Sequence, residues 1–381
     1  MQIKEVSQAF ISIIKSAINE TKLPKSVREK LTDEFLVDLF RLSDFHDLAH
    51  IVSFVLNKEG ITTPEAFKKK ENLAKYRFGI HDYETERIKS VFEEEKVPYV
   101  ILKGATIRKV YANPYLRPSG DIDVLVKKED LKRVNEILIK QFGAKLIEEQ
   151  QHDNLYRTEN DVNIELHFSL GHNEEAKKLL KLTWATSEKT FGEYGLKMPD
   201  KLLSVYLIFH MANHFKGGGC GVKSFIDLHL LNRHSGFSAQ TGKELLEEIG
   251  LEKFADYSYA LANYWFNDGK QSAILTDMER FVISGGVYGT LKQKTKVESA
   301  KTDSDYYKRR IFLSFDEMKS RNRKLEKYPF LFPYYTLKRW CALLSGKKRR
   351  AIKQEIGYKK NFTDEKLQQT DALFKELGLN S

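Results

Sequence analysis

Two aspartates separated by one apolar residue are the part of the sequence best suited to chemistry. Asp121 and Asp123 lie in the run Ser119–Asp123 and are followed by Val124-Leu125-Val126. This composition predicts a buried β-strand, in which alternate side chains point to the same face. The two carboxylates would therefore project on one side and repel each other unless a cation lies between them. Because carboxylate oxygens are hard ligands, the pair predicts a site for Mg²⁺ or Mn²⁺.

A third carboxylate lies further along the chain. Three more strands are predicted at Lys145–Ile147, Leu155–Arg157 and Val162–Phe168, the last two joined by a turn at Asn160-Asp161. In the final strand Glu165 and His167 share one face, opposite to three apolar side chains. Two aspartates and a glutamate on neighbouring strands match two-metal phosphoryl transfer, in which the ions bind the attacking and leaving oxygens. We therefore predict Asp121, Asp123 and Glu165 as metal ligands and catalytic residues; the alternative for Glu165 is an edge-strand carboxylate in water.

A second group of residues upstream could contact phosphate. Val97–Leu102 reads as a buried strand that ends at Lys103-Gly104-Ala105, after which a helix can begin. Free backbone N–H groups at such a turn, beside a lysine, can receive a phosphate, although a glycine after a strand is also a common turn. Arg117, in the loop before Gly120, could hold a phosphate oxygen or lie in water. We predict Lys103, Gly104, Arg117 and Gly120 as the residues that bind phosphate, which would be the phosphates of a nucleotide if the substrate is one.

Helical patterns occupy both sides of this stretch. Residues 1–95 show apolar side chains at helical spacing, including a helix over Asp44–Val52, a lysine-rich helix from about Pro64 and a long helix ending near Glu95. His46 and His50, four residues apart, would share one helical face as metal ligands or, more simply, as histidines satisfied within the fold. Between the strands, Glu129–Phe142 is predicted to be an amphipathic helix stopped by Gly143.

The chain is again predicted to be helical from Pro199 onward. Lys201–Phe215 would present His210 and His214 on one face, but without the adjacent glutamate of a zinc protease helix. The glycine run 217–221 lacks the lysine and serine of a phosphate-binding loop and predicts a connector before a helix over 222–232. We predict acceptor contacts for His210 and for Lys223 in that helix, and no firm role for His214.

Positive charge is concentrated near the C-terminus. The whole chain carries a net charge of +10, and residues 319–360 contain fourteen Lys and Arg against only Glu326 and Glu355. Aromatic side chains are interleaved with these cations, a combination that suits nucleic acid or a membrane interface. The segment predicts contact with a polyanion, an anionic surface or a phosphorylated substrate, or it is a solvated helical face.

Length and composition limit the remaining classes. The 381 residues are 41% apolar, which indicates a globular protein of two or three domains. No apolar run is long enough to span a membrane, and the N-terminus lacks a signal peptide core, so we expect a cytoplasmic protein. Two cysteines, Cys220 and Cys341, are too few for a disulfide framework or a cysteine zinc site.

Taken together, the motifs resemble the polymerase-β-like nucleotidyltransferase superfamily. The resemblance rests on Leu102-Lys103-Gly104, Tyr111, Arg117, Gly120–Val126 and Ile164–Phe168. More closely, the chain resembles the uncharacterised bacterial nucleotidyltransferase family of polysaccharide and peptide natural-product gene clusters. Phe45–His50 is similar to that family's N-terminal helix with an internal histidine, and His210–Leu228 to its histidine-containing helix and the aspartate-bearing helix that follows.

The resemblance implies a small mixed sheet with helices on one face, Asp121 and Asp123 as metal ligands, and Glu165 as the third carboxylate. It also implies that the turn at Gly104 positions a triphosphate. The chain departs from the superfamily at that turn, which is usually Gly-Ser or Gly-Gly with a shorter gap to the aspartates. Here alanine follows the glycine, so triphosphate contacts would come from backbone amides, Lys103 or Arg117.

These patterns predict an α+β fold in which a small mixed-sheet core at 96–198 is flanked by an N-terminal helical bundle at 1–95 and a C-terminal helical domain at 199–381. The predicted function is Mg²⁺- or Mn²⁺-dependent transfer of a nucleoside monophosphate, AMP from ATP in the first instance, to a hydroxyl or phosphate. A small molecule, peptide or glycan precursor is favoured over RNA as the acceptor. The alternatives are a non-catalytic binder on the same fold and an RNA-binding or RNA-modifying protein that uses the basic segment. We expect Asp121→Asn and Asp123→Asn to abolish activity without unfolding the chain.

Overall fold

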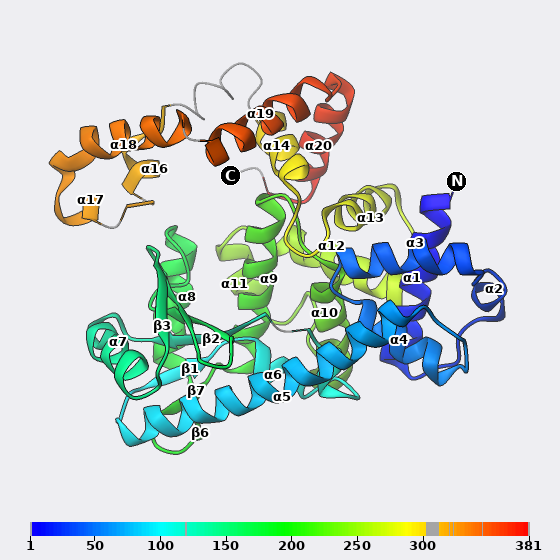
Figure 1. Cartoon of the computed structure of the whole chain (residues 1–381), viewed down its shortest axis with the longest axis horizontal. Coiled ribbons are helices and arrows are strands. Elements are labelled where there is room, and N and C mark those ends of the chain that lie inside the picture. The colour runs from blue at the N-terminus through cyan, green and yellow to red at the C-terminus, as the bar shows by residue number, and fades with distance from the viewer. Residues whose placement is uncertain are drawn as a thin grey trace.

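A seven-stranded mixed sheet lies in the middle of a mostly helical chain, with helices at both ends (Figure 1). The computed structural model describes residues 2–118, 120–301, 312–319, 321–322, 324–344 and 346–379. Ser119 and parts of the basic segment lie outside these residues. The predicted α+β class, with helices flanking a small sheet on both sides in sequence, is confirmed.

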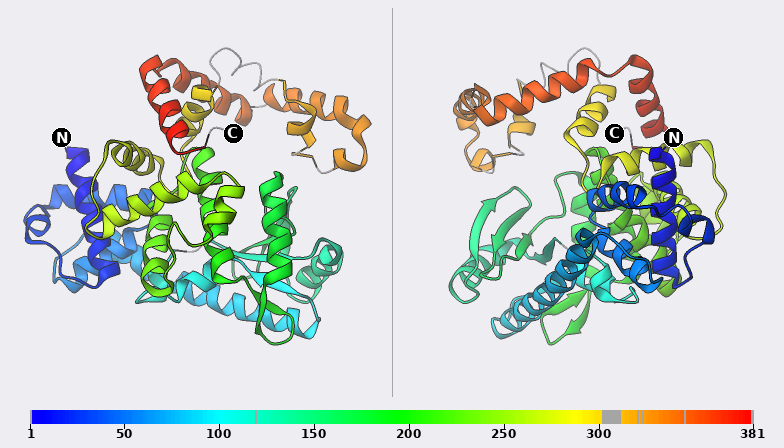
Figure 2. Two further views of the ribbon diagram at one scale, coloured as in Figure 1. Left: turned by 180° about the vertical axis from the view of Figure 1, so that it is seen from behind. Right: turned by 45° about the vertical axis from the view of Figure 1, so that its right-hand side comes forward.

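Five helices precede the sheet. They are α1 (Gln2–Asn19), α2 (Lys25–Arg28), α3 (Asp33–Phe45), α4 (Ala49–Lys58) and α5 (Glu65–Glu94). Thr32 caps α3 by accepting a hydrogen bond from the Phe35 amide, and acidic residues follow in its first turn, where they favour the helix dipole. Figure 2 shows α5 as a long rod that reaches from the other N-terminal helices to the sheet.

Two helix boundaries differ from the sequence prediction. Asp44–Val52 is not one helix: α3 ends at Phe45, Asp47 adopts a left-handed backbone with φ of 54°, and α4 starts at Ala49. His46 and His50 therefore do not share a helical face. The lysine-rich helix and the long helix after it are instead one continuous helix, α5. It contains no proline and a single glycine, Gly79, which is not enough to end it.

The sheet has the strand order β3-β4-β5-β2-β1-β7-β6. The predicted strands are confirmed as β1 (Tyr99–Ile101), β2 (Asp121–Val126), β3 (Lys145–Glu149), β4 (Asp153–Arg157) and β5 (Asn163–His167). The sequence analysis did not include two further strands, β6 (Glu188–Phe191) and β7 (Gly195–Lys197). The central pair, β2 and β5, runs parallel, and β1 lies antiparallel to β2 on its other side.

Side-chain alternation gives the sheet two different faces. Ile122, Val124 and Val126 of β2 join a buried cluster with Ile88 of α5 and Val134 of α7 (Leu131–Lys140). The opposite face carries the two aspartates and, beyond them, Leu125. Leu125 and Val100 belong to a second cluster with residues of α8 (Glu174–Thr186) and α9 (Asp200–Lys216). Helices therefore cover parts of both faces, whereas the resemblance implied helices on one face only.

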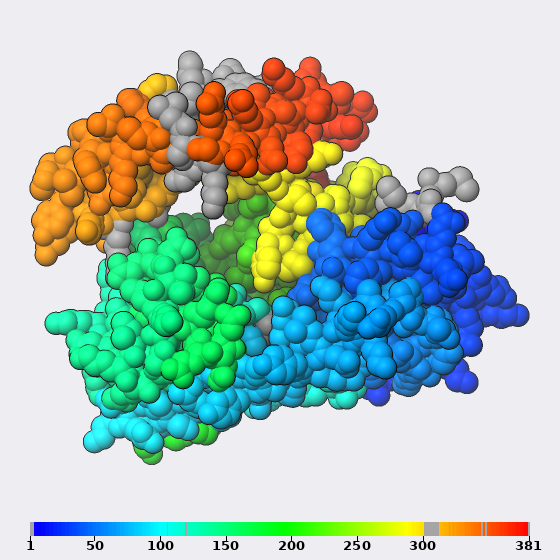
Figure 3. Space-filling view, viewed as in Figure 1, coloured from blue at the N-terminus to red at the C-terminus, as the bar shows by residue number. Residues whose placement is uncertain are grey.

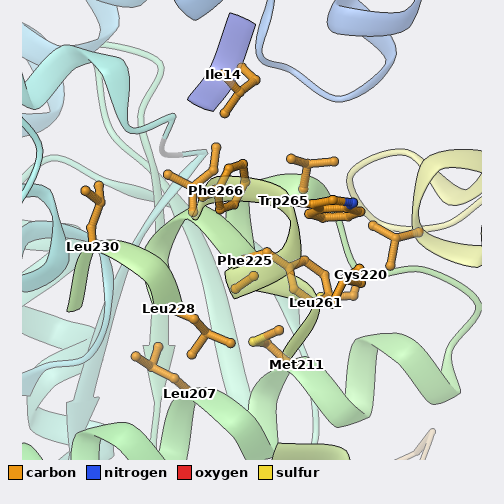
Figure 4. Close-up of a cluster of buried hydrophobic side chains, with 14 of the residues drawn as sticks. Ile14, Leu207, Met211, Cys220, Phe225, Leu228, Leu230, Leu261, Trp265 and Phe266 are labelled. Carbon is orange, nitrogen blue, oxygen red and sulfur yellow. The ribbon is translucent and has the colours of Figure 1, made fainter. Parts of the chain in front are cut away.

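The second cluster joins the two helical ends of the chain in one core. Ile14 of α1 lies in the same cluster as Phe225 of α10 (Val222–Ser235) and as Trp265 and Phe266 of α12 (Glu252–Phe266) (Figure 4). The helices α11 (Lys243–Glu248), α13 (Ala273–Gly285) and α14 (Leu291–Lys301) complete this region. The proposed domain boundaries at 95/96 and 198/199 thus separate elements that share buried contacts.

The basic segment forms part of a C-terminal arm. Its helices are α16 (Phe315–Lys319), α17 (Lys324–Lys327), α18 (Phe332–Leu344), α19 (Gly346–Lys360) and α20 (Asp364–Glu376). Figure 3 shows a hollow between α16–α18 and the sheet region below them, where residues of α16, α17 and α8 line a cavity of about 740 Å³. Across this hollow, Gln151 donates a hydrogen bond to Glu326 of α17 at 3.2 Å.

Candidate functional site

The parallel pairing of β2 and β5 brings the predicted carboxylates together. In the register of the two strands, Asp123 lies opposite Glu165 and Asp121 lies opposite Asn163. Because both strands alternate in the same phase, Asp121, Asp123 and Glu165 project on one face. The Asn163 side-chain amide donates to Asp121 at 3.1 Å, which fixes the orientation of that carboxylate.

His167 completes a compact group that the sequence analysis left without a role. Its Nε2 lies 3.2 Å from Asp123 Oδ1 and 3.4 Å from Glu165 Oε2. One ligand atom from each of Asp123, Glu165 and His167 lies within 4.8 Å of the others, close enough to hold a single metal ion. The signal was present in the sequence, since His167 follows Glu165 by two residues in a strand and so shares its face.

Lys103 reaches this group from the end of β1. It directly precedes α6 (Gly104–Arg108), and its Nζ lies 3.2 Å from Asp123 Oδ1 and 3.1 Å from Nε2 of His210 on α9. Burial alone would raise the pKa of Asp123, but the charges of Lys103 and the hydrogen bond from His167 outweigh it and hold this pKa well below its usual range. Asp123 is therefore ionised in the folded protein.

Asp121 has a different electrostatic environment. Its burial, followed by the negative charge of Glu165, raises its pKa, and the hydrogen bond from Asn163 only partly opposes this. No lysine or arginine is ion-paired with Asp121 among the residues that the structure describes. Of the two aspartates, Asp121 has the less compensated negative charge.

Arg117 is held by a partner that the sequence analysis did not assign. Its Nε and Nη2 donate to the two carboxylate oxygens of Asp227 on α10, at 2.9 and 2.8 Å. Tyr111 donates to the same carboxylate at 2.7 Å. The side chains of Arg117 and Asp227 are only 5% and 8% exposed. The arginine is thus a buried, paired cation at the edge of the site rather than a loop residue in water.

These residues border one cavity of about 150 Å³. All of the predicted site residues line it: Lys103, Gly104, Arg117, Gly120, Asp121, Asp123, Glu165, His210 and Lys223. Burial, followed by the charge of Arg117, lowers the pKa of Lys223 to about 8. Tyr288 extends over the cavity from the loop after α13, and its Oη would lie 3.7 Å from a Cβ at Gly120.

The remaining histidines divide into two kinds. His214 lines the cavity, with its Nε2 3.0 Å from that of His210. His46 and His50 lie elsewhere. Nε2 of His46 is 3.1 Å from the carbonyl oxygen of Ile283, although its buried Nδ1 has no hydrogen-bond partner among the described residues. Nε2 of His50 is 3.0 Å from the carbonyl oxygen of Leu116. The simpler interpretation of His46 and His50, as structural histidines, agrees with these contacts.

Comparison with known families decides the class of the protein. A family model matches residues 36–267, which is more than half of the chain and includes Asp121, Asp123, Glu165 and the cations around them. The chain belongs to the uncharacterised nucleotidyltransferase family. This nucleotidyltransferase is therefore an enzyme whose substrate includes a nucleotide, and the predicted family is confirmed.

The nucleotidyltransferase matches no curated protein and no solved structure. Within the part of the chain that the structure describes, no helix has both the length and the apolar character required to cross a membrane.

Proposed function

We propose that the protein transfers a nucleoside monophosphate, AMP from ATP in the first instance, to a hydroxyl or phosphate group with release of pyrophosphate. The observation that carries the proposal is the pairing of Asp123 with Glu165 across two parallel strands, with Asp121 on the same face. In a nucleotidyltransferase, this arrangement of carboxylates supports metal-dependent phosphoryl transfer.

The residues of the site fit a divalent cation. Asp121, Asp123 and Glu165 concentrate negative charge at a partly buried position, and their oxygens are the ligands that Mg²⁺ and Mn²⁺ prefer. His167 could add a nitrogen ligand, which Mn²⁺ accepts more readily than Mg²⁺. When bound, the metal would neutralise charge on the triphosphate and on the leaving oxygen.

Cations that line the same cavity suit the triphosphate. Lys103 and Arg117 both line it, and Asp227 fixes the orientation of the Arg117 guanidinium. In the structure Lys103 forms an ion pair with Asp123. A phosphate group that enters the cavity would replace Asp123 as the anionic partner of this lysine. Gly104 and Gly120 allow the backbone to approach the nucleotide closely.

In the transfer step, an oxygen of the acceptor forms a bond to the α-phosphorus, and the bond from that phosphorus to the bridging oxygen of the β-phosphate breaks. The leaving group is pyrophosphate. Glu165, whose side chain is 35% exposed against 11% for Asp123, would take the proton of an acceptor hydroxyl. His210 and Lys223 face the same cavity and would contact the acceptor.

Transfer of label from each nucleotide tests the proposal. The protein is incubated with one α-³²P-labelled NTP at a time and a cell lysate, with Mg²⁺ or with a chelator. We expect label to move to one acceptor class, from ATP most efficiently, and only with the metal. If calorimetry showed magnesium-dependent ATP binding while no NTP gave transfer, the protein would be a non-catalytic binder and the proposal would fail.

A further inference from the structure

The outer face of α18 is apolar, although surface helices usually turn polar residues outward. Phe330, Tyr334, Leu337 and Cys341 follow one another at spacings of four, three and four residues, so they form one stripe from η3 (Pro329–Leu331) along α18. The exposed fractions of the first three are 75%, 57% and 60%. We call these four residues the α18 stripe.

The inner face of the same helix already has partners. Phe332 packs against Phe315 of α16 with ring centroids 5.5 Å apart, and Trp340 packs edge-on against Phe312 at 5.6 Å. The small core of the arm is closed by Leu325 and Met318, which are buried. The α18 stripe is therefore not needed to hold the arm together, and it exposes apolar area to water.

Exposed cations surround the stripe in the chain. They are Arg321, Lys324, Lys327, Lys338, Arg349, Arg350, Lys353 and Lys360. The segment has only two acidic residues to oppose its fourteen basic ones, and one of the two, Glu355, is buried. An apolar stripe among cations is the pattern of a helix that lies at the surface of an anionic bilayer.

We infer that the α18 stripe and its cations bind the surface of a membrane that contains anionic phospholipid. Leu337 favours a bilayer over nucleic acid, since an aliphatic side chain gains little from stacked bases but inserts between acyl chains. A second copy of the chain fits less well, because two arms of like charge would repel each other. Figure 1 shows α16–α18 standing off from the helices around the site.

This inference is independent of the proposed function. None of the four residues in the stripe lines the cavity at Asp123, so a change in the stripe leaves the described site intact. Because Leu337 and Phe330 are exposed, substitutions there also remove no buried packing from the arm.

Vesicle sedimentation of the full chain tests the inference. We expect binding to phosphatidylcholine vesicles that contain about one third phosphatidylglycerol, little binding to pure phosphatidylcholine, and weaker binding at high salt. Leu337→Glu should lower partitioning about tenfold or more, and Lys338→Gln about fivefold. Tyr76→Ser, which removes an equally exposed aromatic from α5, is the matched control and should bind like the wild type.

Three results would overturn the inference. They are equal binding to both kinds of vesicle, no binding to either, and unchanged binding of Leu337→Glu. If the wild type instead bound RNA with the same dependence on Leu337 and ignored vesicles, the partner would be nucleic acid. If Leu337→Glu converted a dimer into a monomer without any vesicle binding, the stripe would be an interface between copies.

Discussion

Removal of the Asp227 carboxylate should destabilise the protein strongly, because it would take a bidentate ion pair away from a buried arginine. Asp227 accepts two hydrogen bonds from Arg117 and one from Tyr111, all between 2.7 and 2.9 Å. In Asp227→Ala, the guanidinium would remain in a position where only 5% of the arginine side chain reaches solvent. The buried positive charge would thus lose the carboxylate that accepts two of its hydrogen bonds.

The size of the effect follows from the burial. Breaking a buried pair by removing one partner costs about 3–5 kcal/mol of the free energy of unfolding. Replacing both partners by apolar side chains, in Arg117→Met with Asp227→Leu, should recover most of this loss, since the buried charge is then absent as well. The double variant would still lack the hydrogen bond from Tyr111, which costs about 1–3 kcal/mol if that hydroxyl stays unpaired.

Equilibrium unfolding in guanidinium chloride, followed by tryptophan fluorescence, measures these differences. Asp277→Ala is the matched control, because Asp277 forms a 3.1 Å ion pair with Arg280 in which both side chains are more than half exposed. That variant should lose less than about 1 kcal/mol. The reasoning is refuted if Asp227→Ala stays within about 1 kcal/mol of the wild type, or if the double variant loses as much as the single one.

Three other outcomes follow from the same contacts. Lys103→Ala should weaken Mg²⁺-ATP binding about tenfold or more, as measured by calorimetry. Lys109→Ala, at the exposed end of α6, is the control and should bind Mg²⁺-ATP like the wild type. If both variants had the same affinity, Lys103 would not be a nucleotide-binding residue. Burial lowers the pKa of His46 to about 4, below the value of 6.5 for an unfolded histidine. As the pH falls from 6.5 to 4, the unfolded state therefore takes up this proton first, and the free energy of unfolding falls by about 3 kcal/mol. His46→Phe should flatten that part of the pH profile of unfolding, and an unchanged slope would contradict the assignment. Asp121→Asn should unfold no more easily than the wild type, because it removes a poorly compensated charge. Asp123→Asn should be less stable than the wild type, because it weakens the contacts with Lys103 and His167. If Asp121→Asn were the less stable of the two variants, these charge assignments would be refuted.

The last of these outcomes modifies the expectation from the sequence. Repulsion between two like charges predicted that neither substitution would destabilise the chain. In the structure that argument holds for Asp121 only, because the charge of Asp123 is compensated by Lys103, just before α6, and by His167 of β5. Strand alternation placed both aspartates on one face but could not show which of them a distant lysine would reach.

Local patterns were sufficient for the central strands. The alternation in Ile164–Phe168 and the apolar run after Asp123 determine strand and face within a few residues, so the carboxylate group could be predicted. The strand Glu188–Phe191 was missed because its four residues are all exposed and carry no alternation. The break at Asp47 was missed because it depends on a left-handed backbone at a residue that is not glycine.

Long-range partners could not be read from the sequence. Arg117 and Asp227 are 110 residues apart, and no local pattern indicates that α10 carries the counterion of a loop arginine. Likewise, the core shared by α1 and α12 depends on the packing of helices that are far apart in the sequence. The sequence predicted which residues carry charge near the site, and the fold determined which of them are paired.

The most direct test of the central claim is turnover of α-labelled ATP by Asp123→Asn, with the accepting lysate and Mg²⁺ supplied. Glu149→Gln, which changes an exposed carboxylate on β3 of the same sheet, is the control. If Asp123 holds the metal for nucleotidyl transfer, its variant should remain folded by circular dichroism and lose at least about a hundredfold in label transfer, while the control keeps wild-type turnover. Near-wild-type transfer by a folded Asp123→Asn would contradict the account.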